Sequence, residues 1–399
     1  MTNQRESLWT KNFILVSSIN FQLVLTFYLL VIVIVGYSVA ELNATTAQAG
    51  LVSGLFIIGT LIGRFLVGKF LVRFGHKITL LTGLTGFLVF SGLYFIEFDL
   101  GMLLIVRFFH GFMMGVASTV LGTVIAQIIP ATRRGEGIGY YSLSSTLGTA
   151  IGPFLAIWLM FRFDYNVIFF ISSAIAVSCL VVALGIHIPK LPANLSSTIS
   201  QNQTKQNWLS QYIEIKALPI AIIMLLASIC YSGVLSFITF YATEVNLVDA
   251  ASLFFLMYAL SIMASRPFTG PLMDRKGENI IMYPAFVIMA IGLIVLSFSY
   301  EAWMLLLSAA LLGLGYGNIQ SVCQTIAVKS TSVERMGFAT STFFIFLDAG
   351  LGFGPYFLGI ALDFISYSTL YFCSGIAALC CIFLYFWLHG KKAEQRKTT

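Results

Sequence analysis

A pattern of glycine, arginine and proline occurs twice in this sequence. Residues 140–153, YYSLSSTLGTAIGP, align with residues 342–355, TFFIFLDAGLGFGP, at a constant offset of 202. The same offset pairs identical residues of the two halves: Arg64/Arg266, Gly68/Gly270, Arg73/Arg275, Gly75/Gly277, Gly111/Gly313, Gly115/Gly317, Arg133/Arg335, Gly135/Gly337, Gly148/Gly350, Gly152/Gly354 and Pro153/Pro355. Shared hydrophobicity alone does not produce a match on these residue types. The chain therefore consists of two copies of one unit.

Each copy is built from apolar runs that are long enough to cross a lipid bilayer. Of the 399 residues, 58% are hydrophobic and 10% are charged, which excludes an ordinary soluble globular protein. A bilayer core of about 30 Å needs about 20 helical residues. The runs predict helices near 12–37, 48–71, 78–96, 100–128, 137–161, 166–188, 214–242, 250–273, 279–298, 302–328, 337–361 and 366–389. We therefore expect an all-α membrane protein with twelve transmembrane helices in two pseudo-symmetric six-helix halves.

The predicted halves are residues 1–188 and residues 214–399, the second with a cytoplasmic tail. Between them, residues 189–213 are rich in Ser, Asn, Gln and Thr, which is typical of a flexible polar linker. Loops rich in Lys and Arg remain in the cytoplasm, and nearly all the basic loops fall on one side of the twelve-helix arrangement. We expect both termini to be cytoplasmic, in a cell membrane and specifically a bacterial inner membrane. The formal net charge of +6 follows from this topology and not from a nucleic-acid partner.

The loop after the second predicted helix, residues 68–77, has the sequence GKFLVRFGHK. Its glycines permit a tight turn, and its cations suit the membrane surface. It resembles the G-x-L-a-D-R-x-G-R-K motif of the major facilitator superfamily of secondary transporters, and the resemblance covers nearly the whole chain. It implies the major facilitator fold. A basic loop that only sets the topology is the alternative interpretation.

The first copy of this motif departs from the family at one position. Val72 stands where the family has Asp, and the acid appears in the second copy as Asp274. In the family this acid is thought to latch the cytoplasmic side by facing a helix N-terminus. We expect Asp274 to approach the helix N-terminus near Arg133, Arg134 and Gly135, where the helix dipole favours an anion. The resemblance thus implies a one-sided latch.

Arg107 lies inside an apolar run, in the string RFFHG at residues 107–111. An arginine there is costly unless it meets a cavity, an acid or backbone carbonyls, so it is usually functional. The string is similar to the family's R-x-x-Q-G, with His110 in place of Gln. His110 lies on the same helix face as Arg107, and histidine is the side chain that ordinarily titrates near neutral pH. We expect both residues to take part in proton coupling, with a buried structural clamp as the alternative.

Gly148, Gly152 and Pro153 form a glycine-proline element in the fifth predicted helix. Two glycines four residues apart let a neighbouring helix approach closely, and the proline favours a kink. The element is similar to a motif that the family associates with export. The family motif continues with paired glycines, where this chain has Leu155 and Ala156. A helix that only packs against its neighbour is the alternative.

Asp348 stands near the middle of the eleventh predicted helix, and its equivalent in the first copy is Thr146. The repeat therefore does not require the acid for packing. A carboxylate at this depth can be protonated near neutral pH, so we expect Asp348 to carry a proton. A carboxylate permanently paired with an arginine or with hydroxyl groups is the alternative.

Polar and aromatic residues also interrupt the helices that line the substrate cavity in this family. The predicted cavity residues are Asn20, Gln22, Tyr141, Tyr231, Asn318, Gln320 and Phe344. The predicted gating residues are Arg64, Gly68, Arg73, Gly75, Arg134, Glu136, Gly148, Gly152, Pro153, Arg266, Asp274, Arg275 and Pro355. Such a mixed cavity suits an amphipathic or polar organic substrate.

The resemblance implies a secondary transporter that exports small organic molecules by proton antiport and alternating access. The string from Arg134 to Thr146 is similar to bacterial drug and metabolite exporters, including exporters of metallophores. Proton-coupled uptake of a sugar or organic acid uses the same fold and is the alternative. An intramembrane enzyme is disfavoured, because its paired carboxylates or Ser–His arrangement are missing from the sequence pattern. We expect a monomer that requires no cofactor and no metal.

Overall fold

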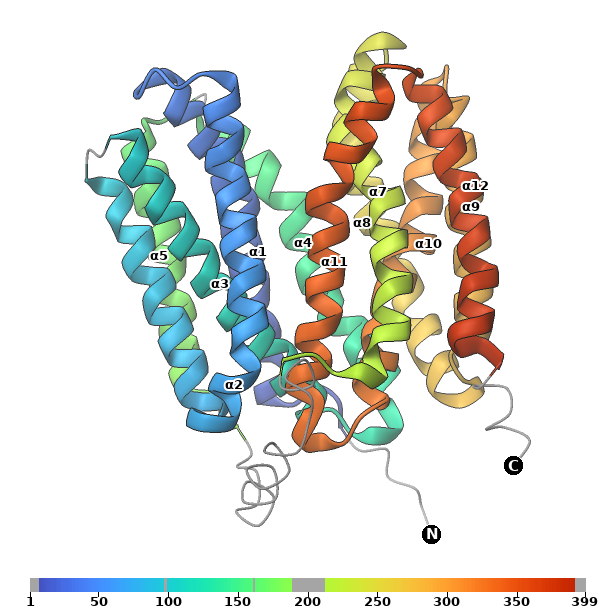
Figure 1. The fold of residues 1–399 in the computed structure, drawn as a ribbon, viewed down its shortest axis with the longest axis horizontal. Helices are drawn as coiled ribbons and strands as arrows, with labels where there is room; N and C mark the ends of the chain where they lie inside the picture. Colours follow the sequence, from blue (N-terminus) through green and yellow to red (C-terminus); the bar gives the residue numbers. More distant parts are fainter. Residues whose placement is uncertain (1–6, 97–98, 161, 189–211, 392–399) are drawn as a thin grey trace. The chain divides into compact units, whose positions relative to one another are not determined.

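The computed structural model describes residues 7–96, 99–160, 162–188 and 212–391 (Figure 1). Its long helices are α1 Lys11–Ala40, α2 Thr46–Gly92, α3 Leu100–Ile128, α4 Arg134–Met160, α5 Tyr165–Leu184, α7 Leu218–Glu244, α8 Val248–Lys276, α9 Asn279–Ser297, α10 Ala302–Lys329, α11 Met336–Leu362 and α12 Tyr367–Tyr385. Within the described residues, eleven helices are long and apolar enough to cross a membrane. Most of the predicted linker, residues 189–211, lies outside this description.

Helix α2 accounts for two of the twelve predicted crossings. Its 47 residues exceed the roughly 20 that a single crossing needs, and its backbone leaves the helical conformation at Gly75, where φ is 75° and ψ is 168°. Gly277, which is the equivalent of Gly75 in the repeat, has φ 85° and ψ 171° after the end of α8. These angles favour glycine, because a Cβ atom would strain the backbone. The twelve-crossing fold is confirmed, with the second and third helices joined at Gly75.

The described chain forms two compact units that do not follow the order of the sequence. The first unit draws on Met1–Pro130, Ser144–Glu214 and Ser332–Ser341. The second unit draws on Ala131–Leu143, Ile215–Thr331 and Thr342–Thr399. The first turns of α11 therefore belong to the first unit, and the first turns of α4 belong to the second.

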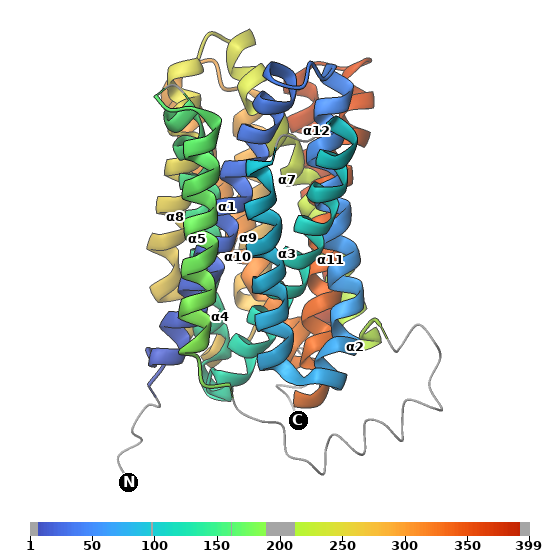
Figure 2. The same cartoon turned by 90° about the vertical axis from the view of Figure 1, so that its left-hand side faces the viewer.

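Within the first unit, α2 packs against α3 and α5, and α1 packs against α2, α3 and α5 (Figure 1, Figure 2). Within the second unit, α10 packs against α8 and α9, and α12 packs against α7 and α9. Equivalent glycines bring equivalent helices together. A Cβ atom on Gly111 would overlap the carbonyl oxygen of Phe56, and one on Gly313 would lie 2.5 Å from the carbonyl oxygen of Tyr258. Phe56 and Tyr258 are themselves 202 residues apart, so the repeat in the sequence is a repeat in helix packing.

Candidate functional site

Arg107 and His110 meet at one tyrosine in the first unit. Arg107 Nη1 donates to the Tyr94 hydroxyl at 3.2 Å, and Arg107 Nε donates to the Val52 carbonyl at 3.3 Å. The same Tyr94 hydroxyl lies 2.9 Å from His110 Nδ1, and Ser91 Oγ lies 3.2 Å from His110 Nε2. The Arg107 and His110 side chains are both 0% exposed. Helix α3 supplies both of them, and Tyr94 comes from the short helix Leu93–Phe95 after α2.

The partners of His110 favour one tautomer of its ring. The Tyr94 oxygen accepts a hydrogen bond from Arg107, so the tyrosine proton is free to point toward His110 Nδ1. In the tautomer assigned from this arrangement, Nδ1 is the acceptor, and Nε2 carries the hydrogen and donates to Ser91 Oγ. The unprotonated nitrogen of His110 thus faces Tyr94. A proton arriving at Nδ1 would turn the Tyr94 hydroxyl away from the ring.

Arg107 has no ion-pair partner within the described part of the chain. In place of a carboxylate, its guanidinium carbon lies 4.3 Å from the centre of the Phe56 ring, a cation–π contact. Arg107 Nη2 makes no hydrogen bond to any described residue. A buried arginine held only by dipoles and a ring is costly, which is typical of a functional position in a membrane.

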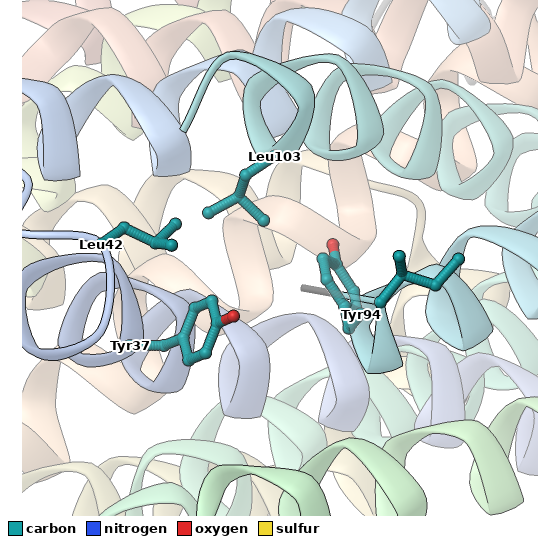
Figure 3. A pocket seen from close by; sticks show the side chains of 5 residues that line it. Tyr37, Leu42, Tyr94 and Leu103 are labelled. Atoms are coloured by element: carbon teal, nitrogen blue, oxygen red, sulfur yellow. The ribbon is translucent and has the colours of Figure 1, made fainter. Parts of the chain in front are cut away.

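Tyr94 also lines a small pocket, together with Tyr37, Leu42, Ile96 and Leu103 (Figure 3). Its lining residues flank both ends of α2, Thr46 and Gly92, and Gly75 lies near the middle of that helix. Tyr94 therefore connects the pocket to the buried pair Arg107 and His110. A phenol both donates and accepts hydrogen bonds, so Tyr94 can accept from Arg107 and donate to His110 at the same time.

Asp274 of α8 binds the N-terminus of α4, and both groups belong to the second unit. Its Oδ1 accepts from the Gly135 backbone N–H at 2.8 Å, and its Oδ2 accepts from the Glu136 N–H at 2.9 Å. Lys329 lies 3.1 Å from Oδ1 and completes the site. The predicted approach of Asp274 to this helix N-terminus is confirmed, with backbone N–H groups and the helix dipole stabilising the anion. We call this contact the Asp274 latch.

Arg266 of α8 is the centre of a second buried network. It donates to Ser142 Oγ at 2.7 Å, to the Gly317 carbonyl at 3.0 Å and to Asn318 Oδ1 at 3.3 Å, and it also donates to Ser321. No described carboxylate forms an ion pair with it. Arg266 therefore links the first turns of α4 to α10 by neutral acceptors.

The glycine-proline element of α4 packs against α1 within the first unit. A Cβ atom on Gly148 would lie 2.8 Å from Val24 Cγ1, and one on Gly152 would lie 2.6 Å from Tyr28 Cβ. Pro153 lies inside α4. The close approach predicted from the spacing of the two glycines is confirmed, and glycine is required for it.

The predicted cavity residues divide into two groups. Asn20, Tyr141, Tyr231 and Asn318 are buried, whereas Gln22, Gln320 and Phe344 are partly exposed. Asn20 Nδ2 donates to Ser144 Oγ at 2.7 Å, and the Tyr231 ring stacks on Tyr316 with a centroid separation of 4.1 Å. The buried members therefore contact neighbouring helices in this conformation. Their part in substrate binding stays a prediction.

The remaining predicted residues occupy varied positions. Arg73 and Arg275 are exposed, Arg64 is buried, and the residues that are partly exposed are Arg134, Glu136, Asp348 and Pro355. Glu136 pairs with Arg133 at 2.7 Å. Tyr94 and Lys329 were not singled out in the sequence, since a tyrosine near a helix end and a lysine in a basic loop have no distinctive spacing.

Comparisons with known proteins agree with this architecture. A model of the Major Facilitator Superfamily matches residues 16–299 and 244–399. An uncharacterised MFS-type transporter of Methanocaldococcus jannaschii is 25% identical over 354 residues, covering 85% of this chain and 88% of that protein. The multidrug resistance protein MdtG of Salmonella dublin is 24% identical over 327 residues, covering 80% of each.

Two solved structures share the fold. The human organic anion transporter MFSD10 matches with a TM-score of 0.75 and 15% identity, over 94% of this chain and 98% of that one. The proton:xylose symporter XylE matches with a TM-score of 0.72 and 14% identity, over 95% of each chain. At this identity the likeness concerns the fold alone.

Proposed function

Because the chain belongs to the Major Facilitator Superfamily, and is thus a transporter and not an enzyme, we propose that it exports small organic molecules in exchange for protons. The observation that carries the direction of transport is the glycine-proline element of α4. Gly148 and Gly152 lie so close to Val24 and Tyr28 of α1 that no side chain fits between the helices. This element resembles the one that the family associates with exporters.

The relatives support the same direction. The Salmonella protein MdtG is named for multidrug resistance, and this chain aligns with 80% of its length. A cavity with both aromatic and polar side chains, as predicted from Gln22, Gln320 and Phe344, suits organic molecules of mixed polarity. The transporter would operate by alternating access, with both termini in the cytoplasm.

The buried network of Arg107, Tyr94 and His110 supports proton coupling. Protonation of His110 Nδ1 would remove the lone pair that accepts from the Tyr94 hydroxyl. It would also create a second cation beside Arg107, which already lacks an ion-pair partner among described residues. The two protonation states therefore favour different arrangements of α3 and the end of α2, which is the differential affinity that coupling requires. Asp348, partly exposed on α11, would bind the transported proton in the second half.

Efflux from living cells tests this proposal. An efflux-deficient bacterium expressing the protein should accumulate several-fold less ethidium, a planar aromatic cation, than the same strain expressing Asp348→Asn. Adding a protonophore should abolish the difference, because the proton gradient drives antiport. Greater ethidium accumulation in the wild-type cells would contradict export. Proton-driven uptake of xylose or lactate by wild-type cells would support the alternative symporter function.

A further inference from the structure

The two copies of the repeat differ where the Asp274 latch is built. Asp274 and Lys329 form an ion pair at 3.1 Å in the second unit. At the offset of 202, their equivalents in the first copy are Val72 and Gln127. The first copy has thus lost both the acid and the cation of the latch. The helix N-terminus that such a latch would hold is nevertheless present, because Gly337 is the equivalent of Gly135.

A different carboxylate pairs with the residue just before this helix N-terminus in the first unit. Glu214, the residue that follows the predicted linker, forms an ion pair with Arg335, which directly precedes α11. Arg335 is the equivalent of Arg133, whose partner Glu136 is replaced by Phe338 in the second copy. The Glu214 side chain is only 5% exposed, compared with 24% for Arg335. The pair is therefore partly protected from water, where an ion pair is stronger than on an open surface.

Tyr212, two positions before Glu214, fixes the end of the linker to α2. The Tyr212 ring stacks on Phe65, with a centroid separation of 4.5 Å and an interplanar angle of 4°. Lys69 Nζ donates to the Tyr212 hydroxyl at 2.5 Å and lies 3.9 Å from the centre of the ring. Stacking and cation–π contacts of this kind stabilise a fixed position. Residues 212–214 therefore join α2 to the start of α11.

The start of α11 is also packed directly on α2. The Phe338 ring covers Gly68, a Cβ atom on Gly337 would lie 2.8 Å from Leu71 Cδ1, and Ser341 donates to the Arg64 carbonyl. The Arg335 guanidinium lies 4.9 Å from the centre of the Phe338 ring. Losing the Glu214 pair would remove one partner of Arg335 and loosen this packing from one end.

We propose that Glu214, the residue that follows the linker, takes the place of the missing carboxylate at position 72 and forms the second gate latch. The start of α4 is then held by an acid of a helix, Asp274, and the start of α11 by Glu214, which follows the linker. The proposal concerns only the closure of α11 on α2 and is independent of the direction of transport or of the coupled ion.

Hydrogen–deuterium exchange of the purified full-length protein tests it without any substrate. In Glu214→Gln, backbone amides of residues 333–344 should exchange about tenfold faster or more, the factor expected for losing one charge-assisted hydrogen bond. Amides of residues 134–143 should be unchanged, because the Asp274 latch holds them. Asp274→Asn should speed exchange in residues 134–143 and leave residues 333–344 unchanged. Glu334→Gln, which removes a neighbouring acid outside the pair, is the matched control and should change neither segment.

A rescue variant tests whether Glu214 acts as the replacement for the missing carboxylate at position 72 or only contributes to packing. Adding Val72→Asp to Glu214→Gln should restore slow exchange in residues 333–344, because the new carboxylate would face the Gly337 and Phe338 N–H groups as Asp274 faces Gly135 and Glu136. Unchanged exchange in Glu214→Gln, with the expected effect in Asp274→Asn, would overturn the proposal. Faster exchange in every helix of Glu214→Gln would also overturn it. So would a double variant, Val72→Asp with Glu214→Gln, in which residues 333–344 still exchange fast.

Discussion

At the scale of single residues, Arg107 is the side chain whose placement needs the most explanation. It is fully buried, and its described partners are the Val52 carbonyl, the Tyr94 hydroxyl and the Phe56 ring. A role in folding alone would not need a guanidinium next to His110, since apolar side chains fill such positions at lower cost. We infer that Arg107 orients the Tyr94 hydroxyl toward Nδ1 of His110.

This role predicts a specific effect of Arg107→Lys. Lysine keeps the charge but has no planar fork with which to reach Val52 and Tyr94 together, so Tyr94 loses its fixed orientation. Uptake of substrate into inside-out membrane vesicles should fall about tenfold or more, consistent with the loss of one charged hydrogen bond. The pH dependence of this transport should also change. Arg162→Lys is the control, because Arg162 is exposed beside Trp158. Normal efflux with an unchanged pH profile in Arg107→Lys would refute the role.

The sequence predicted Arg107 and His110 because polar residues are conspicuous in an apolar run. It could not predict Tyr94, one of 17 tyrosines in the chain, because its importance arises only when the end of α2 folds back beside α3. Burial of Asn20 and Tyr231 was equally beyond the sequence. Which face of a membrane helix meets a cavity depends on packing that periodicity does not resolve when nearly all residues are apolar.

At the scale of helices, the contact between α4 and α1 depends on the absence of a side chain at Gly152. In Gly152→Ala, the new Cβ atom would lie 2.6 Å from Tyr28 Cβ and 3.1 Å from the Leu25 carbonyl oxygen, so α1 must move. We expect a loss of about 1–3 kcal/mol in stability and slower transport. Gly54→Ala of α2 is the control, since a Cβ atom there has nothing within 4 Å. Thermal denaturation in detergent and efflux rates should separate the two variants, and equal behaviour would refute the packing account.

The end of α12 gives a pH-dependent contribution to stability. The helix continues into a π-helical turn, Phe386–Gly390, in which His389 donates to Glu278 at 2.9 Å. This hydrogen bond lowers the pKa of Glu278 from 4.5 to about 2. A carboxyl whose pKa is lower in the folded protein stabilises it above pH 4.5, and the contribution disappears as the pH falls toward 2.

Glu278→Gln should therefore lower the thermal denaturation midpoint at pH 7, and the difference from wild type should shrink steadily below pH 4.5. Glu244→Gln, at an exposed position at the end of α7, should have little effect at either pH. Scanning fluorimetry of the purified proteins provides the comparison. A difference that grows on acidification would contradict the assigned direction of the pKa shift.

Helix positions were largely predictable from the sequence, because the bilayer sets a minimum length for each apolar run. The predicted helix at 302–328 is observed as Ala302–Lys329, and that at 279–298 as Asn279–Ser297. The continuity of α2 was not predicted, because a single glycine with positive φ turns the chain without an intervening loop. The lengths of apolar runs show where helices lie but not how two consecutive helices are joined.

At the scale of the whole molecule, the repeat predicted the fold and also located its exceptions. Equivalent glycines make equivalent contacts in both copies, as Gly111 and Gly313 do. Val72 and Asp274 break the repeat, and the structure has an ion pair at the second position and not at the first. The sequence could not predict that Glu214 pairs with Arg335, because no spacing rule relates two residues that are 121 positions apart.

The central claim, proton-driven export, is tested most directly by reconstituting the protein in liposomes with an acidic lumen. An antiporter should concentrate ethidium in the lumen of wild-type liposomes and stop when nigericin collapses the pH gradient. Asp348→Asn, which mimics a permanently protonated acid, should bind ethidium but fail to concentrate it. Equal accumulation by Asp348→Asn and wild type would contradict Asp348 as the proton carrier. Substrate movement with protons, out of the acidic lumen, would contradict antiport itself.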